Sequence, residues 1–301
     1  MEHFASQLKV IICTLLSAST FGTSLGVSND RNTGCGSAGR LSPFAFLSVV
    51  LYKTTHYLNR DSIKLPACVG TFLPGKYDNY TDTVLIPLSC VTRESDSYVL
   101  RYGADDIWNG PFSEQRVYIV KDVRDIHHLH LHEHNVAVLK LKSSLHLDYN
   151  VQTTCLPMGE SEGKPPISAE CFLLTIADDS YTDAVPVSIA SDSKCSHDSI
   201  SHLAFGQEVP FKRSKHMCIE ISEHEHYSMA VPGPIVCKNR ARWFTYGTII
   251  PTLSAYKSDI FRATKLSGYS RFLESVRTKT IDELIKLYAE NNEGNRYAPL
   301  D

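Results

Sequence analysis

Two histidine-rich runs are the residues whose type and spacing point most directly to chemistry. The first run, at 127–134, carries histidine at alternate positions, and the second is a Glu-His-Glu-His segment at 223–226. In an extended strand, side chains two residues apart share a face, so four imidazoles of the first run would point the same way. Imidazole nitrogen is a ligand for zinc and copper. The candidate ligands are His128, His130, His132, His134, His224 and His226.

Two other interpretations of these runs stay open. The simpler one is that both runs are exposed polar loops that bind nothing specific, and our expectation is therefore no resident cofactor, with zinc or copper as the alternative. The other is a pH response. Histidines crowded on one face repel one another once they are protonated, so the loop could change shape in mildly acidic fluid.

The cysteines indicate a different chemistry. There are nine, of which Cys13 lies in an apolar leader; the other eight are an even number, widely spaced, and form no Cys-x-x-Cys pair. This pattern favours disulfides over a zinc site or a redox motif, and disulfides belong to oxidising compartments. Spacing alone does not choose among the many possible pairings. The eight are Cys35, Cys68, Cys90, Cys155, Cys171, Cys195, Cys218 and Cys237.

The N-terminal residues predict export. Lys9 precedes a short apolar run at 10–16, and small residues follow as far as Gly26. A basic start, a short apolar core and a small-residue exit are typical of a cleaved signal peptide, here 1–26, because a membrane anchor needs about 20 apolar residues. We therefore expect a secreted, extracellular protein. In that compartment the sequon Asn79-Tyr80-Thr81 permits N-glycosylation of Asn79.

The composition sets the scale of the fold and excludes some partners. The chain has 301 residues, 43% of them hydrophobic and 21% charged, which is enough to form one large domain or two fused small ones. The formal net charge is −3, and lysine and arginine are scattered rather than clustered. Such a chain has no long-range attraction for phosphate backbones or anionic lipid, so neither nucleic acid nor a membrane is an expected partner.

Short apolar or alternating runs must position these residues. Between about 43 and 278 the runs are rich in Val, Ile, Tyr and Phe and are separated by turn residues, which is typical of an all-β barrel or sandwich. A linker-like segment at 159–168 divides this region into two halves. From 279 to 287, apolar residues three and four apart follow a Thr or Asp that could cap a helix. Examples of these runs are 44–51, 84–88, 97–102, 115–120, 135–141, 169–176, 235–237 and 243–250.

Five segments, taken in order, carry a family resemblance. They are Cys-Val-Gly-Thr-Phe-Leu at 68–73, Val-Leu-Ile-Pro-Leu-Ser-Cys-Val at 84–91, Asn-Val-Ala-Val-Leu-Lys-Leu at 135–141, Cys-Leu-Pro at 155–157 and Gly-Pro-Ile-Val-Cys at 233–237. The first, second and last are similar to the family's Cys-Gly-Gly-Ser-Leu-Ile, Val-Leu-Thr-Ala-Ala-His-Cys-Val and Gly-Asp-Ser-Gly-Gly-Pro-Leu-Val-Cys. The third and fourth are similar to Asn-Asp-Ile-Ala-Leu-Leu-Lys-Leu and Cys-Leu-Pro. Together they resemble the trypsin-like serine proteases of the chymotrypsin fold.

The resemblance implies an architecture and a disulfide pattern. The fold would be all-β, with two packed six-stranded antiparallel β-barrels at about 43–155 and 165–278. A C-terminal helix and tail would occupy 279–301, and a disulfide would tether an N-terminal segment at 27–42. If the family's bridges are carried over, the implied pairs are Cys68 with Cys90, Cys171 with Cys237, Cys195 with Cys218, and Cys35 with Cys155.

The resemblance also places the catalytic positions. Acyl transfer on this fold needs a Ser nucleophile, a His base, an Asp that orients the His, and backbone donors for the oxyanion. The His, Asp and Ser positions fall on Ser89, Asn135 and Val231, the oxyanion glycine falls on Met229, and the buried Asp of the activated loop falls on Ala230. Valine has no nucleophilic atom, and a serine hydroxyl is no base near neutral pH. We therefore expect no enzymatic activity.

A chain that keeps the scaffold without the chemistry is expected to bind proteins. The resemblance implies a secreted binding protein, cofactor or decoy in an extracellular proteolytic, immune or reproductive (seminal-fluid) pathway. The expected partners are secreted proteases, protease inhibitors or other protease homologues. The alternatives are a histidine-rich zinc- or copper-binding protein on the same scaffold, an active secreted serine endopeptidase with its triad elsewhere, and an unrelated secreted β-sandwich.

Overall fold

A computed structural model of the chain describes a large part of Gly34–Asp301 and nothing N-terminal to it. The expected signal peptide therefore lies outside the described residues, as does most of the expected N-terminal segment. The described residues are 35, 48–57, 60–91, 97–103, 113–121, 135–148, 151–157, 163–177, 181–196, 203–204, 207–208, 211–221, 231–250, 259–284 and 286.

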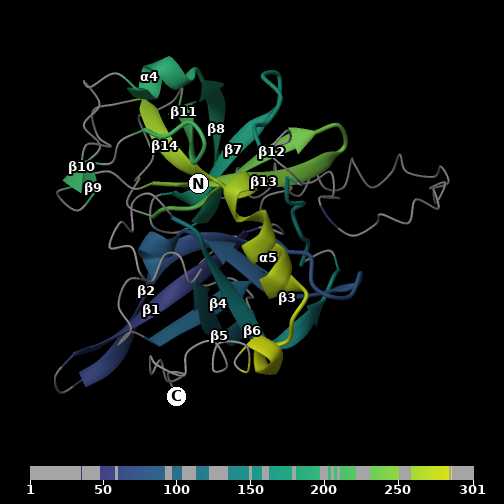
Figure 1. The fold of residues 1–301 in the computed structure, drawn as a ribbon. Coiled ribbons are helices and arrows are strands. Elements are labelled where there is room, and N and C mark those ends of the chain that lie inside the picture. Colours follow the sequence, from purple (N-terminus) through teal and green to yellow (C-terminus); the bar gives the residue numbers. More distant parts are fainter. Residues whose placement is uncertain are drawn as a thin grey trace, which may run out of the picture. The chain divides into compact units, whose positions relative to one another are not determined.

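The first barrel is closed by antiparallel strands in the order β1-β2-β3-β6-β5-β4 (Figure 1). Side chains at every second position point into it, among them Val49 and Leu51 of one strand and Val84 and Ile86 of another. This period of two is the period of a strand with one face in a core. The strands are β1 (Ser48–Tyr57), β2 (Arg60–Leu73), β3 (Tyr80–Ile86), β4 (Ser97–Tyr102), β5 (Ser113–Lys121) and β6 (Ala137–His146).

The second barrel is closed in the order β11-β14-β13-β12-β7-β8. When the six strands of each barrel are numbered one to six in chain order, both barrels have the same cyclic order of neighbours. The prediction of two six-stranded antiparallel β-barrels is confirmed. The strands are β7 (Cys171–Ala177), β8 (Tyr181–Ala190), β11 (His216–Ile221), β12 (Pro234–Asn239), β13 (Arg242–Ile249) and β14 (Ile260–Lys265); a short helix α4 (Asp192–Ser196) and the paired strands β9 (Leu203–Ala204) and β10 (Gln207–Glu208) lie between β8 and β11 in the chain.

The sequence pattern located the strands unevenly. The expected strand at 97–102 has the bounds of β4, whereas the expected strand at 84–88 was wrong at its end: β3 stops at Ile86, and Leu88 lies in a one-turn 3₁₀-helix, η1 (Leu88–Cys90). The reason is Pro87, which has no N–H to continue the ladder. Three strands of the second barrel, β8, β11 and β14, are not among the runs that the pattern singled out.

The helix predicted at 279–287 is found at 281–284, and a further helix that was not foreseen precedes it. Helix α5 (Ser270–Arg277) follows η4 (Leu266–Tyr269), so it begins well before residue 279. Helical conformation resumes at 281–284. There the Thr280 N–H donates to Glu283 Oε2 at 2.6 Å, and the Glu283 N–H donates to Thr280 Oγ1 at 3.3 Å, which is a capping box. Thr280 is thus the cap of the second helical turn only.

Helix α5 follows the second barrel in the chain and packs against the first (Figure 1). Its Leu273 and Val276 are buried with Leu73, Leu85 and Val138 of the first barrel. Within the described residues, no helix has the length and apolar content that crossing a bilayer requires.

The two barrels share a buried apolar cluster and backbone hydrogen bonds. The Val69 N–H donates to the Pro232 carbonyl at 3.1 Å, and Cys155 exchanges backbone hydrogen bonds with Trp243 and Thr245 at 2.8 and 2.9 Å. The shared cluster contains Val50, Tyr52 and Val69 from the first barrel and Leu174, Ile176, Val231, Val236 and Trp243 from the second half of the chain.

Four disulfides fasten this framework. They join Cys35 to Cys155, Cys68 to Cys90, Cys171 to Cys237 and Cys195 to Cys218, which are the pairs that the family resemblance implied. The last two link neighbouring parts of the second barrel, and the first links Cys35 to the segment between the barrels. The Cys68–Cys90 bridge ties η1 to β2, and it matters for the site described next.

Candidate functional site

Ser89, at the sequence-predicted histidine position, lies in the middle of η1. This turn is closed by the Cys90 and Val91 N–H groups, which donate to the Pro87 and Leu88 carbonyls at 3.2 and 3.1 Å. Cys90, which follows Ser89, is anchored to β2 through Cys68. The Ser89 Oγ is buried and makes no hydrogen bond within the described part of the chain. Its hydroxyl therefore has no base beside it there.

Asn135, at the sequence-predicted aspartate position, is 1% exposed and immediately precedes the β6 segment. Its Oδ1 accepts the Ser89 N–H at 2.7 Å, and its Nδ2 donates to the Ile249 carbonyl at 2.6 Å. Its backbone N–H donates to Thr264 Oγ1 at 3.2 Å, and its carbonyl accepts the Thr248 hydroxyl. Because Thr248 and Thr264 are cross-strand partners in the second barrel, Asn135 joins the two barrels.

The surroundings of Asn135 match an amide and do not match a carboxylate. On one side the side chain must accept a hydrogen bond from the Ser89 N–H, and on the other it must donate a hydrogen bond to the Ile249 carbonyl. An amide does both, whereas an ionised carboxylate is an acceptor only. A carboxylate here would bring two acceptor oxygens together with no proton between them, in a place from which water is excluded.

Val231, at the sequence-predicted nucleophile position, is 8% exposed and packs in the apolar cluster between the barrels. Its carbonyl accepts the Thr175 hydroxyl at 3.0 Å. Two residues on, Gly233 passes so close to β7 that a Cβ there would lie 1.8 Å from the Leu174 carbonyl oxygen. The backbone of this segment thus requires glycine at 233, and the Val231 side chain two residues earlier is purely hydrocarbon.

Hydrogen bonds and one disulfide link the three positions at the barrel junction. The Ser89 N–H is hydrogen-bonded to Asn135, and the next residue, Cys90, forms a disulfide with Cys68, which precedes Val69. Val69 in turn holds the carbonyl of Pro232, the neighbour of Val231. The structure therefore assembles at the barrel junction a hydroxyl, an amide and an isopropyl group. None of these three side chains is charged, and none offers a general base.

Other sequence-predicted site residues fall outside the described part of the chain. These are Met229, Ala230 and all six candidate metal ligands, namely His128, His130, His132, His134, His224 and His226. Within the described residues, no group of three or more His, Cys, Asp or Glu side chains is arranged to hold a metal ion. The zinc or copper set stays a prediction.

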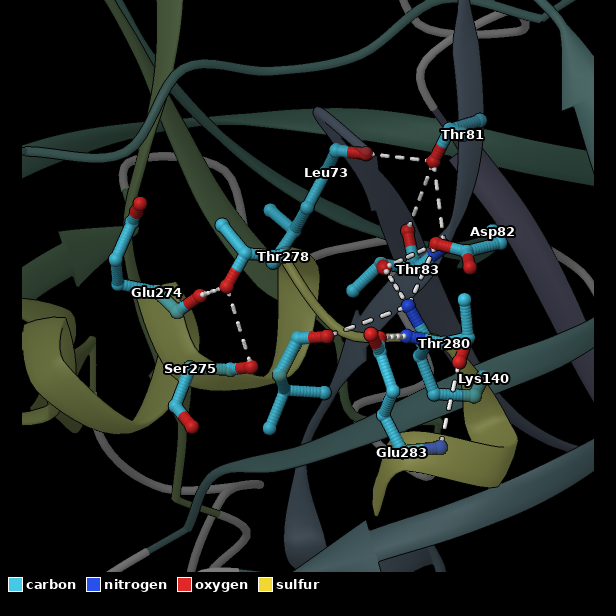
Figure 2. A network of polar contacts seen from close by, with 11 residues as sticks. Leu73, Thr81, Asp82, Thr83, Lys140, Glu274, Ser275, Thr278, Thr280 and Glu283 are labelled. Atoms are coloured by element: carbon cyan, nitrogen blue, oxygen red, sulfur yellow. Dashed lines mark hydrogen bonds and ion pairs between the residues drawn. The ribbon is translucent and has the colours of Figure 1, made fainter. Parts of the chain in front are cut away.

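A buried ion pair near the C-terminal helix was not foreseen from the sequence. Lys140 is fully buried on β6, and its Nζ lies 2.7 Å from Asp82 Oδ1, 3.0 Å from Thr83 Oγ1 and 3.3 Å from the Val276 carbonyl (Figure 2). Burial lowers the pKa of the Lys140 ammonium from its ordinary value, and the neighbouring Asp82 carboxylate opposes that shift. The pair fastens the end of α5 to the first barrel.

The alternation of β6 gives no sign of this pair. Leu139 and Leu141 point into the barrel core, so Lys140 between them faces the outside of the barrel. An outward lysine is normally in water, but here α5 covers that face.

Comparison of the sequence with models of known protein families, and with curated proteins, found no match.

Proposed function

We propose that this chain is a secreted, non-catalytic homologue of the trypsin-like serine proteases that acts by binding other extracellular proteins. The paired barrels, their common strand order and the disulfides support the relationship. The four disulfides also support an oxidising, extracellular location. The expected partners are secreted proteases, protease inhibitors or other protease homologues.

The observation that carries the proposal is the hydrogen bonding of Asn135. In a Ser-His-Asp triad the aspartate is a buried anion that holds an imidazole. Here the corresponding side chain accepts a hydrogen bond from the Ser89 N–H and donates one to the Ile249 carbonyl. The junction thus stabilises a neutral amide that bonds the barrels together, and this use of the position is structural.

The nucleophile position supports the same conclusion. Even with a base nearby, the Val231 side chain has no atom that could form an acyl intermediate. The close approach at Gly233, two residues on, and the disulfide that anchors Ser89 support a scaffold that persists without the reacting groups. A scaffold kept without its chemistry is best explained by use of its surface.

The first test measures turnover. The disulfide-bonded protein, before and after limited treatment with trypsin and its removal, is incubated with a mixture of peptides that samples the residue types before the scissile bond. We expect no cleavage above a buffer blank, with active trypsin at one thousandth of the concentration as the positive control. Cleavage above the blank would show a catalytic centre in this chain and would contradict the proposal.

The second test addresses binding. The tagged chain is returned to the fluid from which it is secreted, and proteins that co-purify are identified by mass spectrometry and re-tested as pure components by calorimetry. We expect at least one protease, inhibitor or protease homologue that binds the pure chain. Failure of every such component to bind would contradict a binding role.

A further inference from the structure

The sequon asparagine lies in a turn that is held rigidly on both sides. The Tyr80 N–H donates to the Tyr77 carbonyl at 3.1 Å, which closes the four-residue turn Tyr77-Asp78-Asn79-Tyr80 between β2 and β3. The Asn79 carbonyl accepts the Leu147 N–H at 2.9 Å, so the turn is also bonded to the chain just after β6. The side chains at 76–80 are nevertheless exposed. Asn79 is therefore presented to solvent from a fixed backbone.

Two exposed aromatic residues flank Asn79. Tyr77 is 66% exposed and Tyr80 is 43% exposed, and both are among the most exposed large apolar side chains of the described residues. The Tyr80 ring meets the His146 ring edge-on at 5.2 Å, which fixes its direction. The two tyrosines line one small hollow, whose other lining residues include Lys76, Asp82, Ser144, Lys279 and Thr280. Aromatic faces beside polar groups suit a sugar ring, which has C–H groups on its faces and hydroxyls at its rim.

The sequon threonine, by contrast, is inaccessible. Thr81 is fully buried, and its Oγ1 donates to the Leu73 carbonyl at 2.6 Å (Figure 2). Its backbone pairs with Leu145 of β6. Transfer of a glycan to Asn-x-Thr requires the threonine hydroxyl as well as the asparagine. The folded chain does not expose both.

We propose that Asn79 receives its N-linked glycan before β3 pairs with β6, and that the first N-acetylglucosamine then packs on the exposed ring of Tyr77. In the transfer, a bond forms between Asn79 Nδ2 and C1 of the sugar. The bond between C1 and the diphosphate oxygen of a lipid-linked donor breaks, and the displaced amide proton leaves with the lipid diphosphate. The proposal depends on entry into a secretory compartment and not on the absence of catalysis.

The order of events follows from the connectivity. Thr81 is synthesised long before its partner Leu145, and at roughly 5–20 residues per second this leaves several seconds in which β3 has no β6 to pair with. Once the strand is paired, the hydroxyl is sealed by the Leu73 carbonyl. A sugar on Tyr77 would then remove aromatic surface from water at little ordering cost, because the turn already fixes both residues.

The order is tested on one protein in two states. The chain is made without a glycan in bacteria, then either refolded with its disulfides or kept reduced and unfolded, and each form is given solubilised oligosaccharyltransferase with a lipid-linked oligosaccharide. We expect intact-mass analysis to show modification of the unfolded form and at least tenfold less of the folded form. Equal modification of the two forms would overturn the order, as would an unmodified Asn79 in protein secreted from eukaryotic cells.

The packing is tested by a double-mutant cycle on secreted protein trimmed to a single N-acetylglucosamine. The unfolding equilibrium constant is compared between this form and Asn79→Gln, in the wild-type background and with Tyr77→Ala. We expect the sugar to lower the unfolding constant about fivefold when the ring is present and to have no effect without it. Tyr77→Phe, which keeps the ring, should retain the effect, and Ile167→Ala, at a fully exposed site elsewhere, serves as the control. An effect of the sugar that is equal with and without Tyr77 would overturn the packing.

Discussion

The first prediction concerns Asn135→Asp, which places a carboxylate where the trypsin-like proteases that the sequence resembles carry one. The Ile249 carbonyl, 2.6 Å from Nδ2, requires a proton donor, and the site is 1% exposed. The aspartate must therefore be protonated to fit, so its pKa in the folded state is raised far above the value of about 3.9 in the unfolded chain. Holding that proton at pH 7 costs at most about 4 kcal/mol, since each pH unit between 3.9 and 7 contributes about 1.4 kcal/mol.

The sign of the pH dependence follows from proton linkage. Between pH 4 and the raised folded pKa, the native variant binds a proton that the unfolded chain has lost, so the free energy of unfolding falls as pH rises. Below pH 4 both states are protonated and the penalty disappears. The Ser89 N–H, which favours the charged form, reduces the penalty but does not change its sign.

The assay is urea unfolding from pH 3.5 to 8 of the wild type, Asn135→Asp and the matched control Asn79→Asp, all produced without glycans. Asn79 is an exposed asparagine in a turn, so its replacement should shift stability by less than about 0.5 kcal/mol at any pH. We expect the Asn135→Asp difference from wild type to grow from near zero at pH 4 to about 2–4 kcal/mol at pH 7. An Asn135→Asp variant as stable as wild type at pH 7 would refute the reasoning about the junction.

Three further predictions test other parts of the fold. Gly233→Ala should destabilise the protein by more than about 3 kcal/mol in urea unfolding, because the new Cβ meets the Leu174 carbonyl, whereas Gly268→Ala, where nothing lies within 4 Å, should cost less than about 0.5 kcal/mol; similar values for the two would contradict the close approach. Lys140→Met should lower the free energy of unfolding by about 2–4 kcal/mol, because it removes the ion-pair partner of Asp82 and the hydrogen-bond donor to the Val276 carbonyl. It should also speed hydrogen exchange in α5 more than in β12, and unchanged exchange in α5 would contradict the role of Lys140 in holding this helix. The backbone N–H of Thr280 lowers the pKa of Glu283 below 4.5, so the capping box is complete above pH 4.5 and is lost as pH falls through the lower folded value; an NMR titration of Glu283 should show this lowered pKa, and an unshifted value would contradict the cap.

Strands could be predicted from the sequence where one face is apolar and the other is not, whereas the pair of barrels was implied by the family resemblance. β14 was missed because Arg262 and Lys265 interrupt its apolar pattern. In the structure these cations are satisfied by the carbonyls of Cys195 and Arg213, which are remote in sequence. β8 was missed partly because of Pro186, which the structure accommodates with its side chain exposed.

The positions of the candidate site residues could be predicted from the sequence, but their hydrogen bonds could not. The motifs around Ser89, Asn135 and Val231 indicated where these residues belong relative to one another. The amide hydrogen bond to Ile249 depends on a carbonyl more than a hundred residues away, and no local pattern announces it. Lys140 was hidden for a similar reason, since a helix from the far end of the chain covers it.

The central claim is that the barrel junction holds no activatable nucleophile. The most direct measurement is the intact mass of the folded, disulfide-bonded protein after incubation with a fluorophosphonate, with and without prior trypsin treatment, beside trypsin as the reactive standard. We expect an unchanged mass for this chain under conditions in which trypsin is fully modified. One adduct per chain, located by peptide mapping at Ser89 or at any other serine, would contradict it.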